Sequence, residues 1–320
     1  YSGSNGMVAT GRSMDWKTEM HSNLWVFPRG MKRNGETGEN SLEWTSRYGS
    51  VVTSAFEIAS TDGMNEKGLV ANLLWLPETE YPVRDKNKPG LAITAWVQYM
   101  LDNFATVEEA VAYIDEDTFQ VVSDMMPDGS RLATLHLSIS DATGDCAIFE
   151  YIGGKLTVYH SKEYKVMTNS PTYNKQLALS EYWKSIGGLS FLPGTNRAAD
   201  RFARASFYIN ALPETDDERI AVASVFSVVR NASVPYGIST PESPEISTTQ
   251  WRTVSESKNL RYFFESSLTP NTFWVNLKDF DLSEGAPVFK LSIANGEMYH
   301  GNTAKNFKTA LPFKFMGVKG

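Results

Sequence analysis

Cysteine and histidine are both scarce in this chain of 320 residues, which contains one Cys and four His. A single Cys cannot form an intramolecular disulfide, and it cannot build a Cys-cluster zinc site. No two histidines are spaced as H-x-H or as a pair four residues apart on a helix, so the usual sequence signature of a hydrolytic metal centre is missing. The sequence therefore gives no support to metal-dependent hydrolysis.

Long apolar runs and the common catalytic motifs are missing as well. No stretch reaches about 18 apolar residues, so we expect no membrane span. There is no G-x-S-x-G elbow, no P-loop, and no G-x-G-x-x-G that opens a helix after a strand. An S-x-x-K match at residues 255–258 falls in a strand-like segment, whereas that motif belongs at a helix start. These absences disfavour an α/β-hydrolase and a nucleotide-binding protein.

Cys146 is the only thiol, and it lies in a predicted strand with no cation beside it in sequence. A reactive thiol needs a nearby positive charge or a helix N-terminus, whereas an ordinary free Cys packs as a small apolar residue. We therefore expect Cys146 to be a buried structural residue rather than a nucleophile.

The chain does have a large apolar fraction, 42%, with 12% aromatic residues. Its 30 basic and 37 acidic residues give a net charge of −7, which disfavours nucleic acid as a partner. A small anionic ligand is still compatible with a local basic pocket. Since neither a linker nor an internal repeat is visible, we expect one domain over residues 1–320.

Strand-like and helix-like segments alternate in blocks. An Asn-Gly turn precedes a strand, T-x-x-E at residues 106–109 is a capping box, and a Gly-Gly pair ends a later helix. The expected strands are 7–12, 24–27, 51–56, 69–76, 135–139, 146–152, 155–160, 164–168, 248–254, 260–265 and 272–277; the expected helices are 91–104, 107–114, 173–186, 197–212 and 216–229. Two strand blocks with helices beside each predict an α+β fold, a four-layer αββα sandwich.

Four local strings carry a resemblance to a known family. They are GRSMDW at residues 11–16, TDGMNEKGL at 61–69, VMTNSP at 166–171 and LPGTNRAADRF at 192–202. In this order and at these separations they resemble the choloylglycine hydrolase family, which contains bile salt hydrolases and penicillin V acylases. The resemblance runs from residue 1 to about residue 315, and the pattern is most similar to the branch found in Gram-negative bacteria such as Bacteroidetes. It implies the αββα fold of N-terminal nucleophile hydrolases.

The resemblance also implies roles for four polar residues. Arg12 matches an Arg beside the nucleophilic sulfur, where a cation favours the thiolate, and Asp15 matches the Asp that holds the amine and the thiol. Asn169 matches an amide donor to the oxyanion of the tetrahedral intermediate, and Arg201 matches an Arg in the same site.

Two tryptophans are implied to line the substrate site. The family uses the backbone N–H at the position of Trp75 for the oxyanion hole, where bile salt hydrolases often have Asn and some penicillin acylases have Tyr. Trp25 matches a pocket-wall position in the Gram-negative branch, where an indole suits a steroid or phenyl face.

The implied nucleophile is an N-terminal Cys whose own α-amino group acts as general base. Matching the start of the sequence to the family places this Cys about five residues before Tyr1, outside the printed sequence. We expect the 320 residues as written to be inactive for this reason. Three explanations for the absence of this Cys are open: further residues precede Tyr1 in the protein, the protein has been truncated, or it is a natural non-catalytic relative.

The resemblance therefore implies a cysteine amidohydrolase that deconjugates glycine- or taurine-linked bile salts. Penicillin V and N-acyl homoserine lactones are alternative substrates, and a bile-acid or acyl-amide binding protein on an inactive scaffold is the non-enzymatic alternative. The resemblance implies no cofactor and no metal, a small-molecule amide as partner, a homo-oligomer that is commonly a tetramer, and a periplasmic location.

Overall fold

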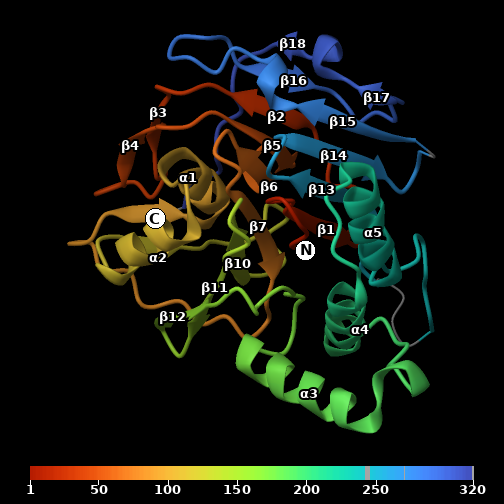
Figure 1. The fold of residues 1–320 in the computed structure, drawn as a ribbon. Coiled ribbons are helices and arrows are strands. Elements are labelled where there is room, and N and C mark those ends of the chain that lie inside the picture. The colour runs from red at the N-terminus through yellow and green to blue at the C-terminus, as the bar shows by residue number, and fades with distance from the viewer. Residues whose placement is uncertain (242–245, 270, 319–320) are drawn as a thin grey trace.

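The computed structural model describes residues 1–241, 246–269 and 271–318, and Figure 1 shows their arrangement. Two β-sheets pack face to face, and helices cover the outer face of each sheet. This is the expected αββα sandwich. The helices are α1 (Trp96–Asn103), α2 (Val107–Asp115), α3 (Tyr173–Ile186), α4 (Ala198–Ala211) and α5 (Glu218–Asn231), with short 3₁₀ turns η1 (Ile93–Ala95), η2 (Gly188–Ser190), η3 (Leu277–Asp279) and η4 (Ala304–Asn306).

The larger sheet has nine strands and is antiparallel throughout. Its spatial order is β12 (Lys155–His160), β11 (Cys146–Ile152), β10 (Leu135–Ser140), β7 (Val70–Trp75), β6 (Ala59–Asn65), β5 (Ser50–Ala55), β2 (Leu24–Phe27), β16 (Phe289–Leu291) and β18 (Lys308–Thr309).

The smaller sheet has five strands, of which only the last pair is parallel. Its order is β1 (Ala9–Trp16), β13 (Thr248–Glu256), β14 (Arg261–Ser266), β15 (Thr272–Asn276) and β17 (Gly301–Asn302). Two further two-stranded ladders join β3 (Lys32–Asn34) to β4 (Glu43–Thr45) and β8 (Gly90–Ala92) to β9 (Gln120–Val122).

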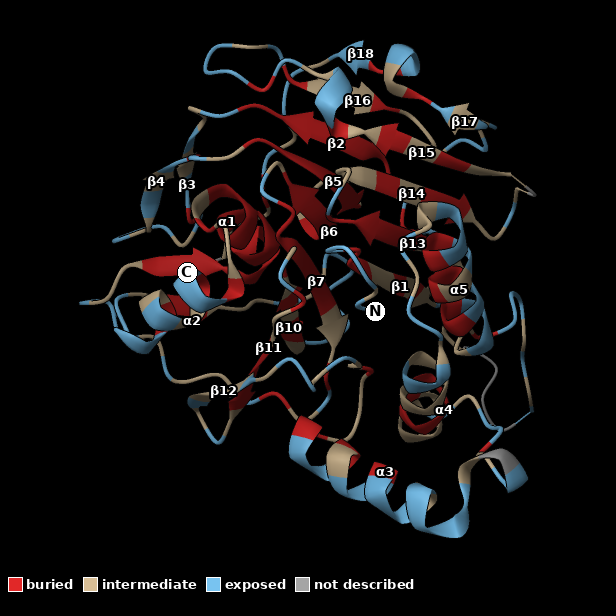
Figure 2. Cartoon of the chain, in the orientation of Figure 1, coloured by how far each residue is buried: buried red, intermediate tan, exposed pale blue. Residues whose placement is uncertain are grey.

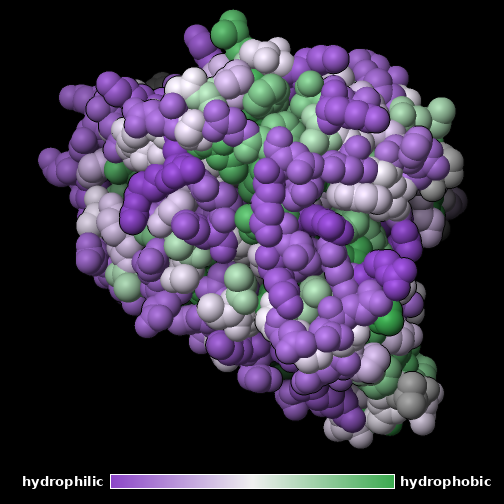
Figure 3. All heavy atoms as spheres, turned by 45° about the horizontal axis from the view of Figure 1, so that its top comes forward, coloured by the Kyte–Doolittle hydropathy of each residue, from purple (hydrophilic) through white to green (hydrophobic). Residues whose placement is uncertain are grey.

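Alternating side chains of the strands build the layers. In β2, Leu24 and Val26 face the smaller sheet, while Trp25 and Phe27 face the layer that contains α1. The outer face of the smaller sheet is covered by α5, whose Val225 and Phe226 pack on Ala9 of β1. Figure 2 shows buried residues concentrated in the central strands and in α1, whereas α3 is mostly exposed. Hydrophilic side chains cover most of the face in Figure 3.

Local signals placed most element ends correctly. Asn5 and Gly6 both have positive φ, 52° and 71°, as a tight turn before β1 requires. Thr106 caps α2 by accepting the Glu109 N–H at 3.2 Å, while the Glu109 carboxylate accepts the backbone N–H of Ala105 rather than that of Thr106. Helix α3 ends at Gly187, which is left-handed with φ 103°.

Two expectations about elements were wrong. The helix expected over residues 91–104 begins only at Trp96, because residues 90–92 form the parallel strand β8 with β9. An apolar run alone does not distinguish a buried strand from a buried helix. The strand expected over residues 164–168 is instead an irregular segment. None of the helices in the described ranges combines the length and apolar character that crossing a bilayer demands.

Candidate active site

A cavity of about 610 Å³ brings together five of the six side chains named from the sequence. Arg12 and Asp15 come from β1, Trp75 from the end of β7, and Asn169 from the segment before α3. Arg201 comes from the first turns of α4. A cavity of this size suits a small organic molecule.

Asp15 is held by two neighbours from different layers. Its Oδ1 accepts a hydrogen bond from Thr249 Oγ1 of β13 at 2.6 Å, and its Oδ2 lies 3.3 Å from Arg201 Nη1. The Asp15 side chain is 14% exposed and the Arg201 side chain 11% exposed. The carboxylate is therefore mostly withdrawn from solvent, fixed in orientation and paired with a cation.

Arg201 joins Asp15 to Asn169. Its Nη2 donates to Asn169 Oδ1 at 2.7 Å, and its Nε donates to the carbonyl of Asn196 at 3.1 Å. The side-chain amide of Asn169 in turn donates from Nδ2 to the carbonyl of Trp75 at 2.7 Å. The positions of the oxygen and the nitrogen in the Asn169 amide follow from its two partners, because the Arg201 guanidinium can only donate and the Trp75 carbonyl can only accept. Carboxylate, guanidinium and amide thus form one connected row in the cavity.

The segment that carries Asn169 is anchored by residues that the sequence analysis did not single out. Nε2 of His136 lies 2.9 Å from the carbonyl of Thr168, and its Nδ1 lies 3.0 Å from Glu150 Oε1. Glu150 also accepts the N–H of Tyr173, the first residue of α3, at 3.0 Å. His136 and Glu150 are both fully buried. The alternation of polar residues in β10 and β11 was the only available signal for this pair.

Arg12 is buried and hydrogen-bonded mainly to backbone. Nη1 donates to the carbonyls of Thr61 at 2.6 Å and Leu73 at 3.2 Å, and the guanidinium carbon lies 5.2 Å from the centre of the Trp251 ring. Burial lowers the pKa of Arg12, and the nearby Asp62 carboxylate opposes that shift. Arg12 therefore supplies positive charge to the cavity wall from a fixed position.

A buried polar network lies behind Arg12 between the two sheets. Asp62 of β6 accepts hydrogen bonds from Thr253 at 2.7 Å and from Tyr262 and Asn72. Burial raises the pKa of Asp62, and it raises that of Tyr262 well above its ordinary value. Such a network fixes the register between the sheets because each of its buried polar groups has a partner.

Two indole rings and an arginine form one wall of the cavity. The Trp16 and Trp75 ring centres lie 5.7 Å apart, and the Arg131 guanidinium carbon lies 4.1 Å from the Trp75 ring centre. Trp16 and Arg131 were not among the residues expected in the site. Trp16 ends the GRSMDW string next to Asp15, which was an available signal, whereas nothing local marked Arg131.

Trp25 does not line this cavity. It is 3% exposed and stacks on Phe27 in the core beside α1, with ring centres 6.1 Å apart. Strand alternation explains the difference, because Trp25 points to the helical layer while its neighbours Leu24 and Val26 point between the sheets. The expectation that Trp25 forms part of the pocket wall is therefore wrong: it is a core residue.

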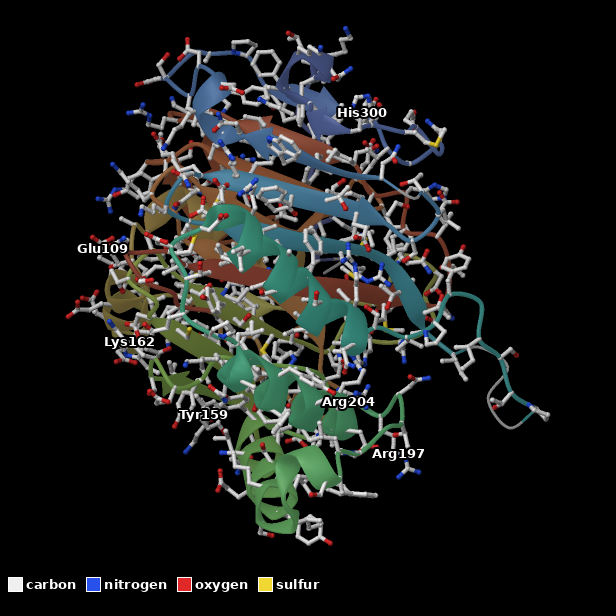
Figure 4. All side chains as sticks on the ribbon, turned by 45° about the vertical axis from the view of Figure 1, so that its right-hand side comes forward. Glu109, Tyr159, Lys162, Arg197, Arg204 and His300 are labelled. Carbon is white, nitrogen blue, oxygen red and sulfur yellow. The ribbon has the colours of Figure 1, made fainter. Side chains whose placement is uncertain are left out.

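Cys146 lies at the first residue of β11, where it is half-buried and lines the cavity. Burial raises the pKa of its thiol to about 11, and the Asp145 and Asp141 carboxylates shift it in the same direction. The thiolate form of Cys146 is thus disfavoured at neutral pH, as expected of a structural residue, although Cys146 is less buried than expected. His300 does not line the cavity, and Figure 4 shows it near the top of the molecule, well away from Arg204 of α4. The described ranges hold no cluster of three or more His, Cys, Asp or Glu side chains suited to a metal ion.

Comparison with known proteins identifies relatives over the whole chain. The family model described as linear amide C-N hydrolases, choloylglycine hydrolase family, matches residues 1–291. A penicillin V acylase from Pectobacterium atrosepticum is 50% identical over 331 residues, which cover 97% of this chain and 88% of that protein. A bile salt hydrolase/transferase from Clostridium perfringens is 28% identical over 259 residues, covering 73% and 77%.

Among the solved structures as well, a penicillin V acylase is more similar to this chain than a bile acid hydrolase is. A penicillin V acylase from Agrobacterium tumefaciens superposes with a TM-score of 0.93 at 55% identity, covering 99% of this chain and 98% of that one. A variant of the conjugated bile acid hydrolase from Clostridium perfringens superposes with a TM-score of 0.78 at 23% identity, covering 91% and 95%. The second likeness shows the shared fold.

Proposed function

This chain belongs to the choloylglycine hydrolase family of linear amide C–N hydrolases, and we propose that it hydrolyses the side-chain amide of penicillin V. The observation that carries the proposal is the Asp15–Arg201–Asn169 row in the cavity. Substrate choice is supported by two penicillin V acylases that are 50% and 55% identical over nearly the whole chain. The sequence analysis had ranked bile salts first, and the relatives favour the reverse order.

We propose that the nucleophile is an N-terminal Cys that precedes Tyr1. Tyr1 and Ala9 exchange backbone hydrogen bonds of 2.9 and 3.0 Å, and Ser2 bridges Val8 in the same antiparallel ladder. β1 is the edge strand of its sheet in the described structure. If the ladder continues along that edge, the fifth residue before Tyr1 lies opposite Met14, beside Asp15.

The chemistry follows from that position. The thiolate sulfur attacks the amide carbonyl carbon, and the Asn169 Nδ2 and the Trp75 backbone N–H stabilise the oxyanion. The α-ammonium of the same Cys gives a proton to the departing amine, so the C–N bond breaks and a thioester remains. Water then attacks the thioester, the α-amine takes its proton, and the C–S bond breaks to release the acid. Asp15 orients the amine, and Arg12 and Arg201 supply positive charge.

Bile salt deconjugation is the second candidate, because a bile salt hydrolase/transferase is 28% identical over 73% of the chain. Both substrates are amides whose amine half carries an acidic group. We also propose that the protein is periplasmic and forms homo-oligomers; cell fractionation tests the first statement, and the second is taken up below.

Hydrolysis by the mature enzyme tests the proposal. We expect release of phenoxyacetate and 6-aminopenicillanic acid from penicillin V, with a kcat/KM higher than for glycocholate or taurocholate. Higher turnover of the two conjugated bile salts would instead favour the second candidate. Binding of these compounds without any turnover would overturn amide hydrolysis and identify a binding protein.

A further inference from the structure

A short hairpin carries Arg131 over the cavity. Met125 and Leu132 form an isolated antiparallel bridge, and the Met126 N–H donates to the carbonyl of Arg131 at 2.8 Å. Met126 and Arg131 both line the cavity. The hairpin thus fixes the backbone of Arg131 at the same wall that carries Trp75.

The Arg131 guanidinium is stacked but not hydrogen-bonded. Its carbon lies 4.1 Å from the ring centre of Trp75 and 5.7 Å from that of Trp16. Within the described ranges its side chain is placed by these two ring contacts, without a hydrogen bond or an ion pair, and the residue is exposed. Stacking on an indole holds the guanidinium plane and leaves the in-plane N–H donors able to bind an anion in a bidentate way.

The three other arginines near the site already use their donors. Arg12 donates to backbone carbonyls, and Arg201 is bonded to Asp15 and Asn169. Arg204 on α4, labelled in Figure 4, donates to the carbonyls of Pro193 and Thr195 at 2.7 and 2.9 Å. Arg131 is thus the arginine of this group whose positive charge faces the cavity unpaired.

The Arg131 guanidinium is linked to the side-chain amide of Asn169 through Trp75. The residue on whose ring it stacks, Trp75, has its carbonyl bonded to Asn169 Nδ2 at 2.7 Å. An acid group on the amine half of an amide substrate is separated from the scissile bond by only a few bonds. Since the protein has a net charge of −7, an anionic substrate needs a local cation to bind well.

We propose that Arg131 is a specificity-determining residue that binds the carboxylate carried by the amine half of the substrate. This rests on the proposed amide hydrolysis and names the group that it selects. Trp16 and Trp75 orient the guanidinium, and amides whose amine half is neutral are disfavoured.

A matched substrate pair tests this inference. N-phenoxyacetylglycine and N-phenoxyacetylglycinamide have the same acyl group and differ in the charge of the amine half. The mature wild-type enzyme should prefer the acid by about tenfold in kcat/KM, and Arg131→Gln should bring that ratio close to one. Arg131→Lys should retain part of the preference. Arg47→Gln is the control, because Arg47 is an arginine stacked on Tyr48 that does not line the cavity.

Two outcomes would overturn the inference. If wild type cleaves the acid and the glycinamide with nearly equal kcat/KM, the enzyme does not recognise the carboxylate. If Arg131→Gln loses kcat/KM equally for both substrates, Arg131 only packs on the indoles. If no phenoxyacetyl amide is cleaved, the proposed function fails separately. Calorimetric titration with 6-aminopenicillanic acid then decides the inference, which requires weaker binding by Arg131→Gln than by wild type and is contradicted by equal binding.

Discussion

Arg201 is the residue through which the site is connected, because one guanidinium reaches both the Asp15 carboxylate and the Asn169 amide. The two ends of its fork fix the distance between a carboxylate suited to orient an amine and an amide suited to bind an oxyanion. The arrangement therefore depends on α4 being correctly placed against β1.

Asn169→Ala tests the oxyanion role directly. Loss of one oxyanion donor typically lowers kcat by about a hundred- to a thousandfold, and we expect a loss in this range for penicillin V with KM nearly unchanged. The measurement is steady-state kinetics on a variant whose circular dichroism matches wild type. An equal rise in KM with unchanged kcat would assign Asn169 to substrate binding instead.

Cys146→Ser tests whether the thiol in the cavity takes part in the reaction. Burial raises the pKa of Cys146 to about 11, so little of its thiol is ionised near neutral pH. Because the pKa is raised, alkylation of Cys146 should be slow at pH 7 and accelerate as the pH rises toward 11. We expect the variant to keep its activity within about twofold.

Contradiction would come from mass spectrometry of wild type treated with iodoacetamide. Rapid labelling of Cys146 at neutral pH together with an inactive Cys146→Ser variant would make it the nucleophile.

Four polar residues of the site could be named from the sequence because they belong to compact motifs. GRSMDW, VMTNSP and LPGTNRAADRF placed Arg12, Asp15, Asn169 and Arg201 in the cavity together. Arg131 belongs to none of these strings. It reaches the cavity only because its hairpin folds over the site, which the local sequence does not show. Trp25 was expected in the pocket wall but lies in the core beside α1. The face to which a strand residue points depends on the sheet and helix packed around it, and a local match does not reveal this.

At the scale of elements, the contact of β1 with α5 controls the position of Arg12 and Asp15. Gly11 precedes Arg12, and a Cβ on Gly11 would lie 2.5 Å from Val225 Cγ1 and 2.8 Å from Val229 Cγ2 of α5. Both atoms belong to short β-branched side chains, so the helix or the strand would have to shift. The close approach of α5 to β1 therefore requires glycine at this position.

Gly11→Ala should lower the free energy of unfolding by about 1–3 kcal/mol and reduce kcat/KM for penicillin V. The measurement is urea denaturation with kinetics on the folded variant. Gly194→Ala is the matched control, because no atom lies within 4 Å of its added Cβ and its φ is not positive. Unchanged stability of Gly11→Ala would show that the sheet and helix are not packed as described.

The buried pair of His136 and Glu150 controls the start of α3. Glu150→Gln replaces the carboxylate that faces His136 and accepts the Tyr173 N–H, so we expect a loss of about 1–3 kcal/mol in the free energy of unfolding. Urea denaturation measures it. A variant as stable as wild type would mean that the pair does not hold this segment.

Element boundaries followed from the sequence where a cap or a turn marks them, as at Thr106, Gly187 and the Asn5–Gly6 turn. They did not follow where long-range pairing decides. Residues 90–92 are a strand only because β9 offers a parallel partner. Tyr164, Val166 and Met167 are apolar because they pack on α3 and α4 and line the cavity, without a strand partner.

At the scale of the whole molecule, α3 carries apolar side chains that the described structure leaves exposed. They are Leu179 at 40%, Tyr182 at 58% and Ile186 at 42%, with Phe191 at 55% just beyond the helix. Figure 2 shows α3 as a mostly exposed helix at the periphery. A second copy of this chain is the occupant that we propose for this face.

We expect a homo-oligomer in light scattering coupled to size exclusion, and Ile186→Glu should shift it toward the monomer because a carboxylate would be buried at the contact. Ile220→Glu on α5 is the control, because Ile220 is similarly exposed at 51% but lies on a different helix. Monomeric wild type would refute the proposed assembly, and an oligomer unaffected by Ile186→Glu would place its interface on another surface.

The most direct test of the proposed mechanism is to identify the N-terminal residue of the purified active enzyme. N-terminal sequencing and intact mass, recorded before and after thiol alkylation, give this result. Continued along β1, the ladder between Tyr1 and Ala9 places the fifth residue before Tyr1 beside Asp15. The proposed mechanism predicts that this residue is a free Cys, alkylated once with loss of penicillin V hydrolysis. Hydrolysis of penicillin V by a protein whose confirmed N-terminus is not Cys would contradict it.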